Sequence, residues 1–329
     1  MGVKKPVFDH PSLKIGERVY SDLQPGQRMP ILNWVVAVTT LALYCGWVNL
    51  LIMLGVAAIW LVWPRYVLVL LWSTLLLPAK PVLWTAFCKL WVFKTWRQYF
   101  RYSYFFEEKL DPTKRYVLYE APHGTFPIGP IVAGTLCQTF FPDAPIYSVA
   151  ANSVFNIPLW RHFISWIGSL PASKSNFKRL LDHGSVAVVV GGIAEMYMCN
   201  PKKERIKMLG RKGFVRIALE EQVDGIVPVY YFGNSQAFNF GPAFLEGVSR
   251  KWRTSLGVLY GVCGLPIPHP VQMYLVHGKP IPVPKVAKDD PEFERHVTEL
   301  LDIAVKGMQD LYENHRKEYG WPEKPLSIE

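Results

Sequence analysis

The feature that most constrains this chain is a stretch of 36 residues without any charge, which lies between Arg28 and Arg65. A helix that crosses the hydrocarbon core of a bilayer needs about 20 apolar residues, so residues 31–79 are about long enough for two short crossings. We therefore predict a membrane hairpin over 31–79 that turns at Pro64–Arg65. A turn near Gly46 is the alternative for the hairpin, and a buried pair of core helices is the alternative to a hairpin.

Positive charge is concentrated around this apolar stretch. Residues 1–110 carry 12 Lys and Arg against 5 Asp and Glu, a balance of +7, whereas the other 219 residues carry only +3. Charge beside apolar sequence, with no nucleic-acid motif, indicates an anionic membrane surface rather than nucleic acid. Because basic residues mark the cytosolic side, we expect a cytosolic segment over 1–30 and a cytosolic globular part. The flanking basic residues are Lys4, Lys5, Lys14, Arg18 and Arg28 before the hairpin, and Lys80, Lys89, Lys94, Arg97 and Arg101 after it.

The segment after the hairpin is unusually aromatic. Residues 84–106 contain 11 aromatic side chains interleaved with four basic ones. Amphipathic rings and long basic side chains suit the headgroup boundary of a membrane, so we predict an interfacial helix within a segment that covers 80–110. The alternative is an aromatic stripe in the protein core.

From residue 111 to 329 the pattern becomes short apolar runs that alternate with helical stretches. Near-continuous apolar strands between helices indicate an α/β sandwich with a largely parallel sheet. The last predicted helix begins with Asp290 as its cap and Pro291 at its first position, and it runs to about 315. Its apolar face comprises Phe293, Val297, Leu300, Leu301, Ala304, Met308 and Leu311. The other predicted elements are strands at 115–120, 145–150, 185–190, 225–232 and 271–278, and helices at 156–168 and 213–222.

Two predicted strands end in residues that can do chemistry. One runs into His123 and Gly124, and the other runs into Gly191, Gly192 and Glu195. Ligands of open α/β sheets bind beyond the carboxyl ends of the strands, so these residues are candidates for one site. A histidine held by a carboxylate is a competent general base, and backbone N–H groups beside glycines can hold an oxyanion. The alternative is a structural histidine in a turn.

Several other chemistries are disfavoured by the sequence. The five cysteines are scattered and include no CxxC pair, so neither a disulfide framework nor a zinc site is expected. The sequence around Ser235 lacks the closing glycine of a nucleophile elbow. There is no Walker loop, no dinucleotide fingerprint and no metal-ligand cluster. The acid that glycerophosphate-type acyltransferases place five residues after the histidine is Ile128 here.

The order of short motifs after the hairpin resembles the acyl-CoA:diacylglycerol acyltransferase type 2 family, which includes monoacylglycerol and wax-alcohol acyltransferases. The resemblance runs from the hairpin to the C-terminus. The family's His-Pro-His-Gly block corresponds to residues 121–124, and its Gly-Gly-x-x-Glu to Gly191, Gly192 and Glu195. The remaining correspondences are Pro158 and Arg161 for Pro-x-x-Arg, 211–214 for Arg-Lys-Gly-Phe, 227–229 for Val-Pro-Val, and 278–281 for the late Gly-x-Pro-Ile.

Two positions depart from the family pattern. The first histidine of the block is Ala121, which leaves His123 as the candidate base. The family's Phe-Gly-Glu-Asn is Phe-Gly-Asn-Ser here, so Asn234 stands where the family has an acid. These departures bear most on the choice of acyl acceptor.

The resemblance implies a glycerolipid-acyltransferase-like fold and acyl transfer from acyl-CoA to diacylglycerol, with His123 and Glu195 as a catalytic dyad. Acyl-CoA is then a co-substrate, and no cofactor or metal is implied. Its phosphates need basic partners, for which Arg161, Arg211 and Lys212 are the candidates. A solvated or headgroup-facing role for the basic run 201–216 stays open.

The resemblance also implies an endoplasmic reticulum membrane protein, with lipid droplets as a second location. Monoacylglycerol or a long-chain alcohol as acceptor, a non-catalytic membrane-shaping protein, a membrane hydrolase and self-association all stay open at this point.

Overall fold

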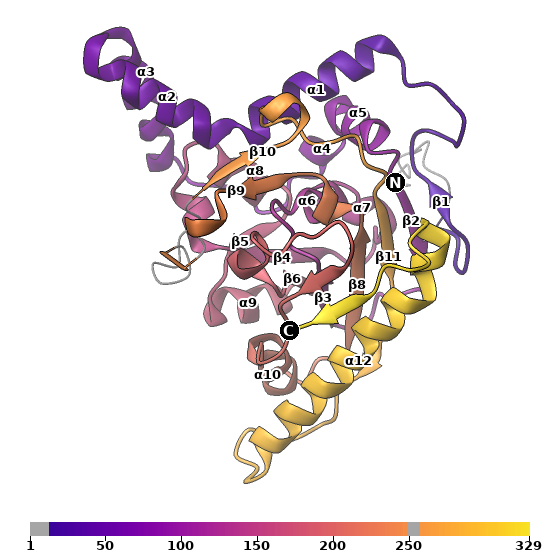
Figure 1. Cartoon of the computed structure of the whole chain (residues 1–329). Coiled ribbons are helices and arrows are strands. Elements are labelled where there is room, and N and C mark those ends of the chain that lie inside the picture. The colour runs from indigo at the N-terminus through magenta and orange to yellow at the C-terminus, as the bar shows by residue number, and fades with distance from the viewer. Residues whose placement is uncertain (1–12, 246, 249–256) are drawn as a thin grey trace, which may run out of the picture.

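The computed structural model describes residues 13–245, 247–248 and 257–329 (Figure 1). Lys4 and Lys5, with the rest of 1–12 in the predicted N-terminal segment, lie outside the described residues. The chain forms a mixed α/β fold around one large sheet, with helices on both of its faces. The predicted α/β class is therefore confirmed.

The large sheet is mostly parallel, as predicted. Its strand order is β1-β2-β11-β8-β3-β6-β4-β5, and β12 pairs with β8 off this path. The run from β8 to β5 is parallel throughout, whereas β11 is antiparallel to β8. All five strands predicted from the sequence are present. The bounds are β1 Val19–Tyr20, β2 Ser103–Phe106, β3 Tyr116–Ala121, β4 Ile146–Ala150, β5 Ser169–Pro171, β6 Ser185–Val189, β8 Gly225–Phe232, β11 Tyr274–His277 and β12 Ile281–Pro282.

The two faces of the sheet are covered by different sets of helices. On one face lie α9 (Lys174–Leu181), α10 (Gly213–Glu220) and α12 (Phe293–Tyr319). The seven residues predicted for the apolar face of the last helix are all buried there. On the other face lie α5 (Trp91–Tyr99), α6 (Ile128–Gly134), α7 (Cys137–Phe140) and α8 (Trp160–Trp166), whose apolar side chains share one core with β2 and β8.

The start of α12 differs from the prediction. Its cap is Glu292 and its first residue is Phe293, not Pro291. Asp290 instead closes the turn before the helix, because its carboxylate accepts the N–H of Glu292 at 2.8 Å. Its carbonyl oxygen also accepts the N–H of Phe293.

Two small sheets lie outside the large one. β9 (Asn239–Gly241) and β10 (Val258–Tyr260) form an antiparallel pair. β7 (Glu204–Ile206) and β13 (Leu326–Ile328) form a parallel pair, so residues 326–328 lie against a segment 122 positions earlier. Neither small sheet was predicted from the sequence.

The predicted hairpin region is three helices: α1 (Ile31–Cys45), α2 (Trp47–Trp60) and α3 (Trp63–Ser73), followed by the 3₁₀ turn η1 (Thr74–Leu76). α1 packs on α5 and buries Ala37, Leu41, Tyr44 and Cys45, so it belongs to the body of the protein. α2 and α3 lie side by side and project from the body (Figure 1). The chain bends at Gly46, the alternative break point, but the predicted turn at Pro64–Arg65 lies at 61–62 instead, because Pro64 and Arg65 belong to the first turn of α3.

Within the described residues, no helix on its own has the length and apolar character needed to cross a membrane. Taken together, α1 and α2 have the necessary length and apolar character, but the two helices meet at a bend of 63°. The exposed side chains of α2 and α3 are nevertheless almost all apolar, for example Ile59, Trp60, Val69 and Leu70, each more than 60% exposed. The membrane hairpin over 31–79 therefore stays a prediction, narrowed by the structure to α2 and α3.

The prediction of one interfacial helix over 84–106 is wrong for most of that segment. It forms α4 (Thr85–Cys88), α5 and the sheet strand β2. Trp84 and Trp91 near its start are exposed, whereas from residue 95 to 106 only Arg101 is. Arg97 is buried and pairs with Asp22 instead of extending to lipid. The aromatic rings form part of the core, because they pack between α1 and α8, with Trp96 donating its indole N–H to Thr40 at 2.7 Å. The buried residues are Phe93, Trp96, Tyr99, Phe100, Tyr102, Tyr104 and Phe106.

Candidate active site

The two predicted reactive segments meet at one edge of the sheet. β3 and β6 are parallel neighbours, with Glu120 opposite Val189, so the residues that follow each strand emerge side by side. The carboxylate of Glu195, in the 3₁₀ turn η3 (Gly192–Glu195), lies 2.5 Å from the backbone nitrogen of His123. Parallel pairing thus brings together residues 72 positions apart.

Glu195 binds the main chain rather than the imidazole. Its Oε2 accepts the N–H groups of His123 and, at 3.3 Å, of Gly124, while Oε1 accepts the N–H of Lys207 at 2.8 Å. The expected dyad, in which Glu195 orients the His123 ring, is therefore not the arrangement found. Glu195 instead fixes the main-chain conformation of the loop that carries His123.

Gly191 leaves the space that this carboxylate occupies. A Cβ atom at position 191 would lie 1.9 Å from the Glu195 carboxyl carbon, far inside van der Waals contact. The Gly-Gly-x-x-Glu spacing therefore has a steric reason, since only glycine lets the chain fold its own glutamate back against the start of the turn.

The His123 ring is oriented by the peptide carbonyl of the next residue. Nδ1 lies 2.8 Å from the carbonyl oxygen of Gly124, and because a carbonyl only accepts, Nδ1 carries the proton. In the neutral ring Nε2 is then the basic nitrogen. Burial lowers the pKa of His123, which favours this neutral form near pH 7.

Asn234 holds the same loop from the opposite side. Its Nδ2 donates to the carbonyl oxygens of Pro122, at 3.1 Å, and His123, at 2.9 Å, and its Oδ1 accepts the N–H of Gly129. An ionised acid at this position could not donate to two carbonyls, so this hold on the loop depends on the amide of Asn234. The sequence alone indicated that this position departs from the family pattern but predicted no role for Asn234 in holding the loop.

The predicted oxyanion donors are only partly available. The N–H of Gly124 is directed at Glu195, which removes it as a free donor. Gly192 has a positive φ of 61° in the turn between β6 and Glu195. Oxyanion binding by Gly191 and Gly192 stays a prediction.

Burial raises the pKa of Glu195 to about 7, and its three backbone N–H bonds lower the pKa only in part. The nearby carboxylate of Glu204 also raises the pKa.

The three predicted acyl-CoA ligands lie in different places. Arg211 donates to the carbonyl oxygen of Gly191 at 3.3 Å, beside the Glu195 turn. Arg161 donates to the carbonyl oxygen of Leu75 at 2.6 Å and so binds the middle residue of the η1 turn. Lys212 donates to Thr298 of α12. The structure therefore places Arg211 at the candidate site and directs Arg161 and Lys212 toward other elements.

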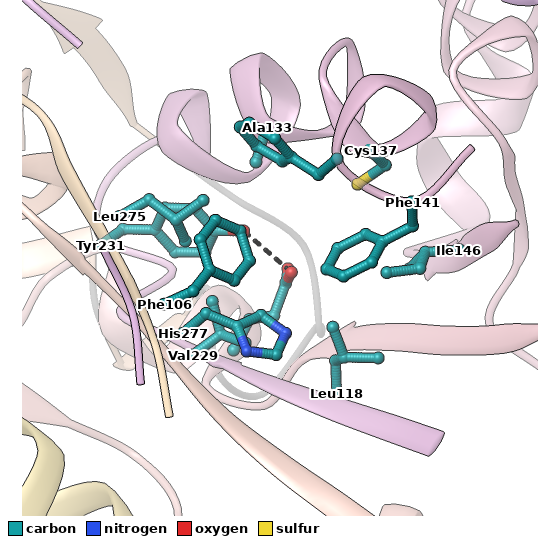
Figure 2. Close-up of a pocket in the computed structure, with 12 residues that line it drawn as sticks. Phe106, Leu118, Ala133, Cys137, Phe141, Ile146, Val229, Tyr231, Leu275 and His277 are labelled. Carbon is teal, nitrogen blue, oxygen red and sulfur yellow. Dashed lines mark hydrogen bonds between the residues drawn. The ribbon is translucent and has the colours of Figure 1, made fainter. Parts of the chain in front are cut away.

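A second group of buried titratable residues, which includes Glu120 of β3, lines the cavity drawn in Figure 2. Glu120 accepts the hydroxyl of Tyr231 at 2.8 Å, and burial raises its pKa to about 7. His277 lines the same cavity, and burial lowers its pKa to about 4. The cavity measures about 20 Å³, room for about one water molecule and far too small for an acyl chain.

Among the described residues there is no group of three or more His, Cys, Asp or Glu side chains arranged to hold a metal ion. The groups that the structure gathers at the candidate site are the His123 imidazole, the buried Glu195 carboxyl, the Asn234 amide, the Arg211 guanidinium and main-chain groups. This set suits proton transfer to and from a hydroxyl or thiol.

Comparison with known proteins agrees with this chemistry. The sequence model of the diacylglycerol acyltransferase family matches residues 52–329, and the chain belongs to that family. It is 27% identical over 333 residues to diacylglycerol O-acyltransferase 2-like protein 6 of Mus musculus, covering 91% of this chain and 95% of that protein. It is 28% identical over 262 residues to diacylglycerol O-acyltransferase 2A of Umbelopsis ramanniana, covering 73% and 72%.

Among solved structures, the 1-acyl-sn-glycerophosphate acyltransferase PlsC of Thermotoga maritima aligns with a TM-score of 0.41 and 12% identity, over 84% of this chain and 95% of that one. The family membership establishes that the protein is an O-acyltransferase.

The substitution Gly191→Ala should abolish most acyl transfer. The added methyl group cannot coexist with the Glu195 carboxylate, and displacing a catalytic group by about 1 Å costs on the order of 100-fold. Gly134→Ala is the matched control, because a Cβ there meets only Ile167 at 3.5 Å, ordinary contact. Turnover of both variants, normalised to folded protein, checks the prediction. Equal activities would show that Glu195 does not need its present position.

Glu120→Gln should stabilise the protein at high pH only. Because folding raises the pKa of Glu120 from its ordinary value of about 4.5 to about 7, the wild type loses stability as pH rises from about 4.5 to about 7. Glutamine has no proton to lose in this pH range. The difference in free energy of unfolding between the variant and the wild type should therefore be about 3 kcal/mol more favourable to the variant at pH 8 than at pH 4. Unfolding at both pH values measures this difference, with the exposed Glu108→Gln as control. The same ΔΔG at both pH values would contradict the buried, protonated state of Glu120.

Proposed function

We propose that this O-acyltransferase moves a fatty acyl group from acyl-CoA to the free hydroxyl of diacylglycerol and so makes triacylglycerol. The observation that carries the proposal is the His123 ring, whose Nδ1 proton is held by a carbonyl so that Nε2 is the base. The family match and the names of the relatives support diacylglycerol as the acceptor.

In the proposed reaction, Nε2 of His123 takes the proton of the acceptor hydroxyl as its oxygen attacks the thioester carbonyl. The new carbon–oxygen bond forms, the carbon–sulfur bond breaks, and the imidazolium returns its proton to the departing coenzyme A sulfur. The carbonyl oxygen of Gly124 stabilises the imidazolium through the Nδ1 proton. Glu195 and Asn234 keep the loop in place through both steps and exchange no proton with substrate.

For acyl-CoA, Arg211 is the proposed phosphate partner nearest the reacting groups. Of the other basic residues in 201–216, Arg205 pairs with Glu329 and Arg216 with Glu294, so part of that charge is already balanced. Lys202 and Lys203 are exposed and carry the rest of the proposed attraction for the anionic co-substrate.

The proposed location is the endoplasmic reticulum membrane, with the catalytic part in the cytosol. The apolar α2 and α3 would enter the bilayer, where diacylglycerol dissolves. Their 14 and 11 residues correspond to about 21 and 17 Å of helix, against a hydrocarbon core about 30 Å thick. The hairpin is therefore proposed to enter from the cytosolic side and return without reaching the far surface.

His123→Ala should lower turnover by about 10²–10⁴-fold, the contribution typical of a positioned general base. The exposed His183→Ala is the matched control and should retain activity. Purified enzyme with labelled acyl-CoA and a panel of diacylglycerol, monoacylglycerol and long-chain alcohol gives both results. Normal turnover by folded His123→Ala would overturn the mechanism, and preference for another acceptor would correct the substrate.

The proposed orientation predicts the thiol chemistry of sealed microsomes. Cys263 is exposed on the globular part and should react with a membrane-impermeant maleimide added outside, with Cys263→Ser identifying that signal. A cysteine introduced at Leu61, in the turn between α2 and α3, should react only after detergent is added. Protection of Cys263 in intact microsomes would contradict the proposed orientation. Labelling of a cysteine at position 61 in intact microsomes would contradict the insertion of the hairpin into the bilayer.

A further inference from the structure

An ion pair is buried beneath the candidate site. Lys324 and Glu204 have side chains that are 7% and 1% exposed, and Nζ lies 2.5 Å from Oε1. The same carboxylate accepts the hydroxyls of Ser235, at 2.7 Å, and Tyr230, at 3.2 Å. Such a pair is retained in a protein interior only where its geometry satisfies both charges.

The ion pair belongs to a longer seam between the end of the chain and residues 204–209. Strand β13 pairs with β7, and the N–H groups of Met208 and Leu209 both donate to the carbonyl oxygen of Glu329 at 2.8 Å. Arg205 closes the seam on its outer side by pairing with the Glu329 carboxylate.

Two paths lead from this seam to His123. In the first, residue 207, flanked by the paired residues 206 and 208, donates its N–H to Glu195, which holds the backbone of His123. In the second, Glu204 holds the hydroxyl of Ser235, whose neighbour Asn234 holds the carbonyl oxygens of Pro122 and His123. Both sides of the His123 loop thus depend on one segment.

We infer that the C-terminal segment 324–329 positions the candidate base, with Lys324 and Glu204 as positioning residues that act through Glu195 and Asn234. They touch no reacting atom. The inference rests on the proposed function for its effect on turnover, but its effect on the loop is independent of it.

The test measures amide exchange and kinetics on the full-length enzyme in detergent. Lys324→Met keeps length and removes the charge, and it should raise exchange at the amides of 123, 124 and 207 roughly tenfold as their shared support loosens. It should also lower kcat by on the order of tenfold with little change in KM, because the base is misplaced while the substrate contacts persist. Lys324→Arg, which restores the charge, should recover most of both.

A second buried ion pair supplies the control. Arg97 and Asp22 are similarly buried but join α5 to the segment before α1. Arg97→Met should destabilise the protein without selectively raising exchange at 123, 124 and 207. If Lys324→Met does not fold, Glu329→Gln, which weakens only the partly exposed end of the seam, should give a smaller change of the same sign.

Unchanged exchange at those three amides in folded Lys324→Met, or in Glu329→Gln if the first does not fold, would overturn the inference. An equal rise in Arg97→Met would overturn it too. Increased exchange with normal turnover would retain the seam as a support of the loop and contradict the proposed role of His123 instead. The two failures are therefore distinguishable.

Discussion

The arrangement of the site depends on one carboxylate that is turned inward. Glu195 accepts three backbone N–H groups from two separate segments, and it can do so only because Gly191 has no side chain. Burying a carboxylate costs less free energy when three amide N–H groups donate to it than when none do, yet burial still keeps the pKa of Glu195 near 7. The acidic residue of the motif is consequently a structural anchor as much as a chemical group, and the loop bearing His123 takes its conformation from it.

This anchoring explains how a histidine can act as a base without a carboxylate on its ring. A peptide carbonyl, that of Gly124, takes the position that an aspartate holds in many catalytic triads, and it fixes the tautomer equally well. A carbonyl dipole stabilises an imidazolium less than a full negative charge does. The ring therefore remains a neutral base in its buried setting and is not locked in the charged form.

The sequence predicted the parts of this fold that follow from local patterns. The apolar runs located five sheet strands, the 3.6-residue periodicity of 293–311 located the buried face of α12, and two strand ends located the site. It did not predict the burial of 93–106, because an aromatic segment with interspersed basic residues has the same composition at a membrane surface as in a core. The burial of the rings and contacts between distant residues, such as that of Arg97 with Asp22, 75 positions away, distinguish the two.

The roles of Asn234 and Lys324 could not be predicted from the sequence, for a related reason. Their partners lie 111 and 120 positions away, and the side chains differ from ordinary polar residues only in what they bind after folding. The choice between ring and backbone as the partner of Glu195 likewise depends on ångström-scale placement that residue spacing does not encode.

The bend at Gly46 has a consequence for how the protein would sit on lipid. Pro266 packs against Gly46, Trp47 donates its indole N–H to the carbonyl oxygen of Pro158, and Trp160 donates to that of Tyr44. The junction is thus clamped by two loops of the body instead of being a free linker. With the proposed hairpin in the bilayer, α2 would be a rigid connection that fixes the distance and the tilt of the catalytic part relative to the lipid surface. Lipid packing and bilayer thickness would therefore directly affect the access of substrate to the site.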